Sequence, residues 1–155
     1  MLLSTLQALF ERDLHKLYKE IKAYQKEANL WHTEQDITNS AGNLCLHLVG
    51  NLNAFIGAEL GQTGYVRDRP FEFNGKNVPR TSLLEQIVTT QEMVKNVLAN
   101  LTEEQLAQEY PKEVFSGKMT TGFFLVHLAT HLTYHLGQIN YHRRLLDAKA
   151  SNTAI

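Results

Sequence analysis

The chain has 155 residues, of which 43% are hydrophobic and 20% are charged, and this composition is typical of a globular domain with its own core. Fifteen Lys and Arg against sixteen Asp and Glu give a formal net charge of −1, so the basic stripe of a nucleic-acid-binding protein is missing. The single cysteine, Cys45, excludes an internal disulfide and a four-cysteine zinc site. Because the first six residues lack the basic segment of a signal peptide, we expect a cytoplasmic protein.

The first half of the chain predicts two long helices. Apolar residues recur every three or four positions and predict a first amphipathic helix, with the stripe Leu3, Leu6, Phe10, Leu14, Leu17, Ile21 and Tyr24. After a polar connection that opens at Trp31, a second helix is expected from the N-cap residue Ser40 to Gly61. Residues 61–80 hold three glycines and two prolines among charged residues, and we interpret them as a long loop.

The second half predicts two more long helices and one short one. The capping box Ser82-Leu83-Leu84-Glu85 predicts the start of the third long helix, and Thr102 begins a short helix that stops before Pro111. Residues 111–117 are turn-rich and favour a small hairpin around Ser116-Gly117. Thr120 or Thr121 then begins a last helix that runs to about Leu146. Four long helices with one long crossover predict an all-α four-helix bundle over residues 1–150, followed by a frayed tail over 151–155.

The last predicted helix carries no formal charge as far as His142. From Met119 to His142 there are 24 uncharged residues, long enough to span a bilayer. Four histidines, Gln138 and Asn140 lie in this stretch, and each is costly in hydrocarbon. The sequence therefore favours an inner helix of a soluble bundle over a membrane span.

Three of these histidines share one face of the helix. At about 100° per residue, His127, His131 and His135 advance by only about 40° per step, on the side that faces the core. Buried imidazoles need polar partners, so these residues are either ligands of a metal ion or hydrogen-bonded core histidines.

A metal ion can take only two ligands from this row. Histidines at i and i+4 lie about 6 Å apart along the axis, whereas His127 and His135 lie about 12 Å apart. One pair must therefore be completed from another helix, and His47 on the apolar stripe of the second helix is the candidate. Cys45 is turned about 200° away from His47. The spacing alone leaves open which pair binds.

Two segments resemble the DinB/YfiT superfamily. They are Asn43-Leu44-Cys45-Leu46-His47-Leu48 and His131-Leu132-Thr133-Tyr134-His135-Leu136-Gly137-Gln138-Ile139. The resemblance implies an up-down-down-up bundle in which His47, His131 and His135 bind a divalent metal, usually zinc or nickel. Many members carry Arg after the second histidine of the pair, where this chain has Leu136.

Several residues near these ligands receive predicted roles. Asn51 and Gln138 lie one turn beyond ligand positions and can orient a ligand or a bound water, and His127 is expected to pack one turn above the site. Tyr134 and Tyr141 are expected in helix packing, and His142 at the surface or at an edge of the bundle. The Arg67-Asp68-Arg69 cluster is interpreted as solvated charge, with contact to an anionic substrate as the alternative.

The predicted function depends on a metal ion that keeps one coordination position open. Three neutral imidazoles leave a divalent ion a position for water or substrate, which we expect to face the bundle end covered by residues 61–80. The resemblance implies a transferase that joins a low-molecular-weight thiol to an electrophile. A metal-dependent hydrolase and a non-catalytic ligand- or partner-binding bundle are the alternatives, and the lack of an acid or base beside the ligands disfavours hydrolysis. We expect a small-molecule substrate and, from the resemblance, a homodimer, with neither nucleic acid nor membrane as a partner.

Overall fold

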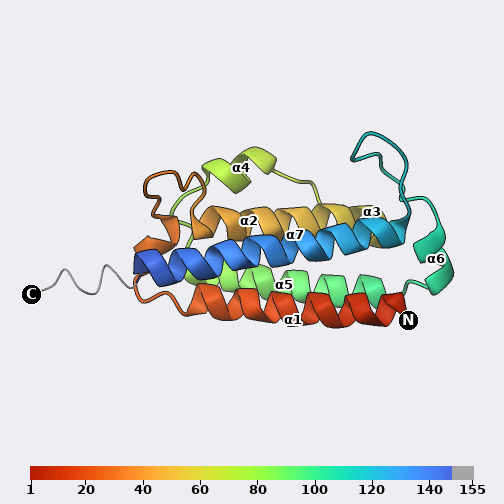
Figure 1. The fold of residues 1–155 in the computed structure, drawn as a ribbon, viewed down its shortest axis with the longest axis horizontal. Helices are drawn as coiled ribbons and strands as arrows, with labels where there is room; N and C mark the ends of the chain where they lie inside the picture. Colours follow the sequence, from red (N-terminus) through yellow and green to blue (C-terminus); the bar gives the residue numbers. More distant parts are fainter. Residues whose placement is uncertain (148–155) are drawn as a thin grey trace, which may run out of the picture.

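Four long helices form the bundle in the computed structural model, which describes residues 1–147. They are α1 (Leu2–Lys22), α2 (Ala41–Leu52), α5 (Arg80–Ala99) and α7 (Thr121–His142). Helices α1 and α7 run in one direction and α2 and α5 in the other, which is the up-down-down-up order that the family resemblance implies (Figure 1). The predicted tail, 151–155, lies outside the described residues.

Shorter elements extend and connect these helices. A π-helical stretch, Asn53–Ala58, carries α2 into α3 (Glu59–Gly61), which ends at Gln62 in the left-handed region. Another, Arg143–Asp147, extends α7. The connections contain a 3-10 helix (Glu27–Trp31), α4 (Arg69–Asn74) and α6 (Glu103–Ala107).

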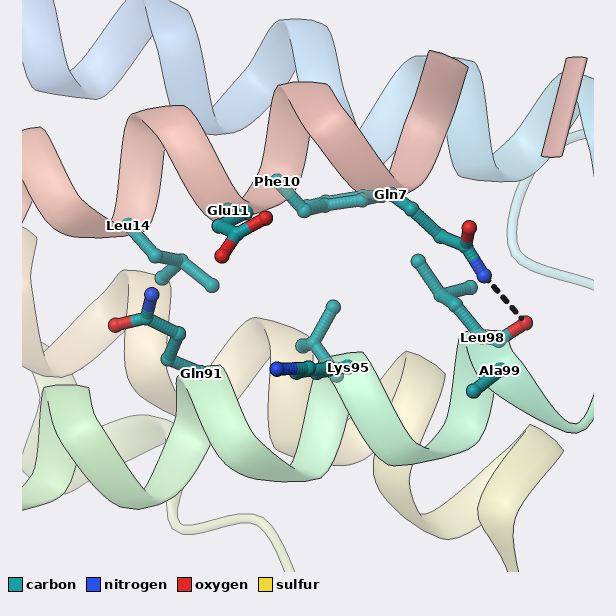
Figure 2. Close-up of a pocket in the computed structure, with 9 residues that line it drawn as sticks. Gln7, Phe10, Glu11, Leu14, Gln91, Lys95, Leu98 and Ala99 are labelled. Atoms are coloured by element: carbon teal, nitrogen blue, oxygen red, sulfur yellow. Dashed lines mark hydrogen bonds between the residues drawn. The ribbon is translucent and has the colours of Figure 1, made fainter. Parts of the chain in front are cut away.

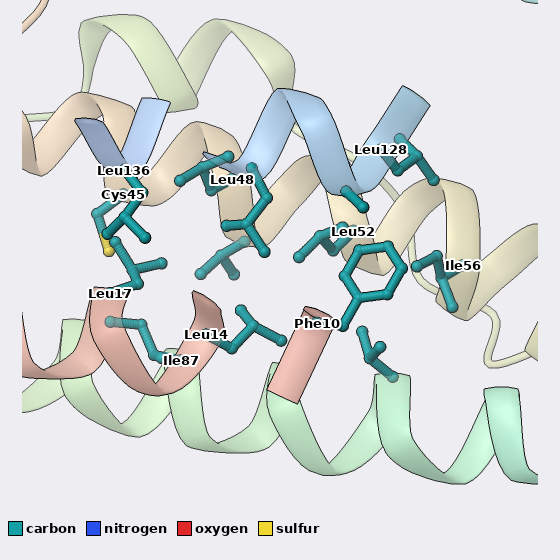
Figure 3. Close-up of a cluster of buried hydrophobic side chains, with 14 of the residues drawn as sticks. Phe10, Leu14, Leu17, Cys45, Leu48, Leu52, Ile56, Ile87, Leu128 and Leu136 are labelled. Atoms are coloured by element: carbon teal, nitrogen blue, oxygen red, sulfur yellow. The ribbon is translucent and has the colours of Figure 1, made fainter. Parts of the chain in front are cut away.

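The apolar stripes meet in one core between the four long helices. Figure 3 shows leucines and Phe10 of α1 against side chains of α2, α5 and α7. The labelled core residues are Phe10, Leu14, Leu17, Cys45, Leu48, Leu52, Ile56, Ile87, Leu128 and Leu136. On the α1–α5 side, a groove of about 240 Å³ remains between the two helices, where the Gln7 amide donates to the Leu98 carbonyl at 3.1 Å (Figure 2).

Side-chain caps begin three of the helices where the sequence predicts them. The hydroxyls of Ser40 and Thr120 accept from the backbone N–H groups of Asn43 and Phe123, which starts α2 and α7. Thr102 and Gln105 form a complete capping box at α6. Each of these caps joins residues only three positions apart, so the sequence pattern alone was enough to predict where the helices begin.

Three local predictions are wrong. The predicted loop 61–80 contains α4, which begins because the Asp68 carboxylate accepts from the Phe71 N–H and Pro70 occupies the first turn. Helix α5 begins at Arg80, after Pro79, and not at the capping box of Ser82. The expected hairpin around Ser116-Gly117 is reduced, within residues 1–147, to isolated bridges at Glu109–Thr120 and Phe115–Gly117.

The last helix also differs from expectation in which side chains it buries. Tyr134 and Tyr141 are 65% and 64% exposed, so the prediction that they pack between helices is wrong. His142, expected at the surface or at an edge of the bundle, is buried. Its Nε2–H donates to the His32 carbonyl at 2.8 Å, and its Nδ1 accepts from the Tyr24 hydroxyl at 2.7 Å, so both ring nitrogens are satisfied inside the fold.

One stretch passes a length-and-hydropathy test for a membrane span. It is Ala41–Gly61, and 61% of its tested window is buried inside the bundle. A core helix of a soluble protein passes the same test.

Candidate metal centre

Two helices bring one ring nitrogen from each of three histidines together. His47 lies on α2, and His131 and His135 lie one turn apart on α7. The Nε2 atom of His131 is 3.2 Å from that of His47 and 3.1 Å from that of His135. One ligand atom of each residue lies within 4.8 Å of the others. Among residues 1–147, no further His, Cys, Asp or Glu joins this group.

The spacing of these nitrogens suits a bound metal ion. In a tetrahedral zinc site with Zn–N bonds of about 2.0–2.1 Å, two nitrogen ligands lie about 3.3 Å apart. The two Nε2–Nε2 distances, 3.1 and 3.2 Å, are close to that value. The three imidazole rings stand nearly perpendicular to one another, with interplanar angles of 77°, 88° and 86°. The residues therefore fit a divalent metal ion.

Burial holds His131 and His135 in the neutral form that binds metal. Burial, together with the neighbouring imidazoles, lowers the pKa of His131 to about 4. Burial also lowers the pKa of His135, against the opposing effect of the hydrogen bond to Gln138. A neutral imidazole has a free lone pair, so neither ligand must lose a proton to bind a metal near pH 7.

A carboxylate from the connecting segment fixes the orientation of His47. The Glu72 Oε2 atom lies 2.9 Å from the Nδ1 atom of His47, and both side chains are buried. Because the ionised carboxylate can only accept, the Nδ1–H donates to it and the Nε2 lone pair faces the other two histidines. This contact corrects the expectation that no acid lies beside the ligands.

Glu72 is itself held by Arg67. The guanidinium donates from Nε to Oε1 at 2.7 Å and from a terminal nitrogen to Oε2 at 2.8 Å. Burial alone would raise the pKa of Glu72, but the hydrogen bonds from His47 and Arg67 outweigh burial and lower it. Arg67 therefore binds an internal carboxylate, and the prediction that it belongs to a solvated cluster is wrong.

The backbone of α2 leaves room for this carboxylate. A Cβ atom at Gly50 would lie 2.1 Å from the Glu72 Oε1 atom, so only glycine fits there. The Asn43 side-chain amide donates to the carbonyls of Glu72 and Gly75 at 3.0 and 2.8 Å, which fastens α4 to α2. A glycine in the middle of a helix was the one sequence signal of this packing.

The remaining predicted residues lie at different distances from the group. The Gln138 Oε1 atom accepts from the Nδ1–H of His135 at 2.6 Å, which directs the Nε2 lone pair of His135 inward. Asn51 is buried on α2, and its Oδ1 atom has no hydrogen-bond partner within the described chain, nor does the Nδ1 atom of His131. His127 stacks on Phe124, with ring centres 5.8 Å apart, outside the three-histidine group.

A cleft of about 450 Å³ borders the group on the α7 side. Its walls include His135, Gln138, Tyr134 and Tyr141 of α7, together with Leu44 of α2 and residues 36–39. The 61–80 connection runs along the side of α2 and not over an end of the bundle, which corrects the expected position of this segment (Figure 1). The space beside the histidines is of the size that small molecules occupy.

A comparison with known protein families found a match. The family model described as the DinB superfamily matches residues 4–139, a range that contains the three histidines, Arg67 and Glu72. A comparison with curated proteins found no match.

Proposed function

This chain belongs to the DinB superfamily, and we propose that His47, His131 and His135 bind a divalent metal ion in a metal-dependent enzyme. Zinc or nickel is the proposed metal. The observation that carries the proposal is the convergence of three Nε2 atoms, 3.1 and 3.2 Å apart, from imidazoles of which two are directed by acceptors on their other nitrogen. A proton on the Nε2 atom of His131 could satisfy only one of its two Nε2 neighbours, so hydrogen bonding among core histidines does not account for the convergence of all three atoms.

Each neighbouring residue has a defined task in this proposal. Glu72 keeps the proton of His47 on Nδ1, and Gln138 does the same for His135. Arg67 balances the charge of Glu72, so the local side chains add no net charge. A divalent ion bound by these three imidazoles would keep its full charge and an open position, and would lower the pKa of a thiol or water bound there.

The proposed reaction is transfer of a low-molecular-weight thiol to an electrophile. The thiol proton passes to solvent, the sulfur forms a bond to the electrophilic carbon, and the leaving group departs with the electron pair of the broken bond. Both oxygens of Glu72 are occupied by Arg67 and His47, so Glu72 is not free to act as the general base of a hydrolase. The cleft beside His135 is the proposed place for the electrophile.

Metal content tests the ligand set. Purified protein should carry about one divalent ion per chain, and His47→Ala should lose most of it although α7 keeps both of its histidines. His127→Ala is the matched control, because it removes an imidazole from the same face of α7 but outside the group. Equal metal in the wild type and in His47→Ala would contradict the ligand set.

Activity tests the reaction. The metal-loaded protein should consume glutathione, bacillithiol or a mycothiol analogue in the presence of a small electrophile, and chelation should abolish turnover. Because the core is formed by four apolar stripes, the chelated protein should retain its helical circular dichroism. If no thiol reacts but an ester or amide is cleaved with the metal present, the protein is a hydrolase. If nothing reacts, the proposal of an enzyme fails.

A further inference from the structure

Two buried polar atoms beside the three histidines have no hydrogen-bond partner within the described chain. They are the Nδ1 atom of His131 and the Oδ1 atom of Asn51. Asn51 is only 7% exposed, so solvent does not replace the missing partner. Buried polar atoms in folded proteins are nearly always paired, so two unpaired atoms next to one candidate metal centre need a common explanation.

The packing of α2 on α7 places Asn51 next to His131. The ring centre of His47 lies 5.0 Å from that of His131 and 5.2 Å from that of His135, so His47 is level with the turn between them. Asn51 follows His47 by one turn, or about 6 Å, on the same face of α2. Because α2 and α7 run in opposite directions, this step leads back along α7, to the side of His131 that is away from His135 (Figure 1).

The other two histidines determine where His131 carries its proton when no metal ion is bound. His47 donates its Nδ1–H to Glu72 and His135 donates its Nδ1–H to Gln138, so the Nε2 atoms of both rings are acceptors. The Nε2 atom of His131 lies 3.2 and 3.1 Å from these two acceptors. A neutral imidazole carries one proton, and on Nε2 this proton hydrogen-bonds one of them. In the metal-free protein the Nδ1 atom of His131 is therefore an acceptor.

This proton position explains why the two unpaired atoms do not bond to each other. The Nδ1 atom of His131 and the Oδ1 atom of Asn51 are both acceptors in that form, and two acceptors cannot share a hydrogen bond. A metal ion on Nε2 takes up the lone pair of that nitrogen, so the proton of the neutral ring must then lie on Nδ1. The Nδ1 atom becomes a buried donor that needs an acceptor, and the Asn51 oxygen is a buried acceptor that needs a donor.

We propose that Asn51 is the positioning residue of His131, and that its Oδ1 atom accepts the Nδ1–H that His131 carries only when its Nε2 atom binds the metal ion. As Nε2 releases its proton to solvent, Nδ1 takes one from solvent, so the ring stays neutral and no net proton is lost. The terminal torsion of asparagine is broad, so its oxygen can reach the imidazole without a change in the backbone. Each ligand then has an acceptor on its Nδ1 atom, as His47 and His135 already do. The inference rests on the proposed metal site and not on the proposed reaction.

Zinc affinity and metal-free stability test this role together. Asn51→Leu removes the acceptor but keeps the approximate size of the side chain, and should raise the zinc dissociation constant about 10- to 100-fold in competition with a chromophoric chelator. The urea midpoint of the metal-free variant should equal or exceed that of the wild type, because the Oδ1 atom of Asn51 has no partner to lose there. Asn51→Asp keeps an acceptor oxygen at the same position and should restore most of the zinc affinity.

Asn53→Leu is the matched control, because it removes an amide two positions further along. The Asn53 amide donates to the Val49 carbonyl at 2.9 Å and to the Thr90 hydroxyl at 2.8 Å, and neither contact involves a histidine. This variant should show the opposite pattern, with a lower metal-free urea midpoint and an unchanged zinc dissociation constant. If Asn51→Leu loses metal-free stability as Asn53→Leu does, Asn51 is a structural residue and the proposal fails.

Nuclear magnetic resonance of the histidine ring nitrogens tests the movement of the proton. In the metal-free protein, ¹⁵N shifts should show His131 protonated on Nε2, and addition of zinc should move the proton to Nδ1. The Nδ1–H of zinc-loaded protein should exchange with solvent more slowly in the wild type than in Asn51→Leu. A proton on Nδ1 of His131 before zinc is added would overturn the proposal. A wild type that binds no zinc would overturn the proposed function as well, whereas equal zinc binding by the wild type and Asn51→Leu would overturn this inference alone.

Discussion

Replacing Glu72 by Gln should weaken metal binding by about 10- to 100-fold, or about 1.4–2.8 kcal/mol, the usual effect of losing a partner that orients a histidine ligand. The substitution keeps the shape of the side chain, and Gly50 still leaves room for it, so it changes the charge without creating a cavity. The amide oxygen can still accept from the Nδ1–H of His47, so the lower end of this range is expected for Gln and the upper end for Glu72→Ala. The loss of charge also leaves Arg67, whose side chain is only 16% exposed, without its ionic partner.

Competition with a chromophoric chelator would give the metal dissociation constant of each variant, and urea unfolding of the metal-free forms would give the cost to folding. The unfolding free energy should fall by about 1–3 kcal/mol, because a buried charge loses its partner. Glu59→Gln is the matched control: it removes the same charge from a carboxylate that pairs with Lys112 away from the histidines. If Glu72→Gln and Glu59→Gln bind metal equally well, Glu72 does not act on the metal site through His47.

Three further predictions test other parts of the structure. His127→Ala should leave the metal content intact, as measured by elemental analysis; loss of the ion would mean that the binding pair on α7 includes this residue. In an open helix, Gly50→Ala would stabilise the protein by up to about 1 kcal/mol. Here it should instead destabilise the protein and weaken metal binding, because the new Cβ displaces Glu72. A gain of stability in urea unfolding would contradict this. The metal-free protein should lose stability as the pH falls below about 6.5. Burial lowers the pKa of His131 and of His142 in the folded state, so the unfolded chain binds protons at a higher pH than the folded chain does. Urea midpoints between pH 7.5 and 5 measure this, above the range in which carboxylates titrate, and a midpoint independent of pH would refute it.

The helices were predictable from the sequence because their signals are local. Apolar residues every three or four positions determine which face of α1 is buried, and the hydroxyls of Ser40, Thr102 and Thr120 satisfy N–H groups only a few residues away. The six residues of α4 are too few to show a period, so the sequence pattern missed that helix.

The candidate site was predictable only in part. The pairing of His131 with His135 is a property of one helix, since residues four apart share a face. His47 was the candidate for the third ligand because it is a polar residue on the apolar stripe of α2, but the choice of His131 with His135 over His127 with His131 came from the family resemblance.

Local sequence patterns therefore define the long helices, their apolar faces and the uncharged length of α7. Folding in three dimensions is needed to bring Glu72 to His47, since the contact joins residues 25 positions apart through a bend that no periodic pattern encodes. Folding also buries His142 and leaves Tyr134 and Tyr141 exposed. Burial at those positions depends on which neighbouring helix or connection covers each part of α7, and hydrophobicity along one helix does not contain that information.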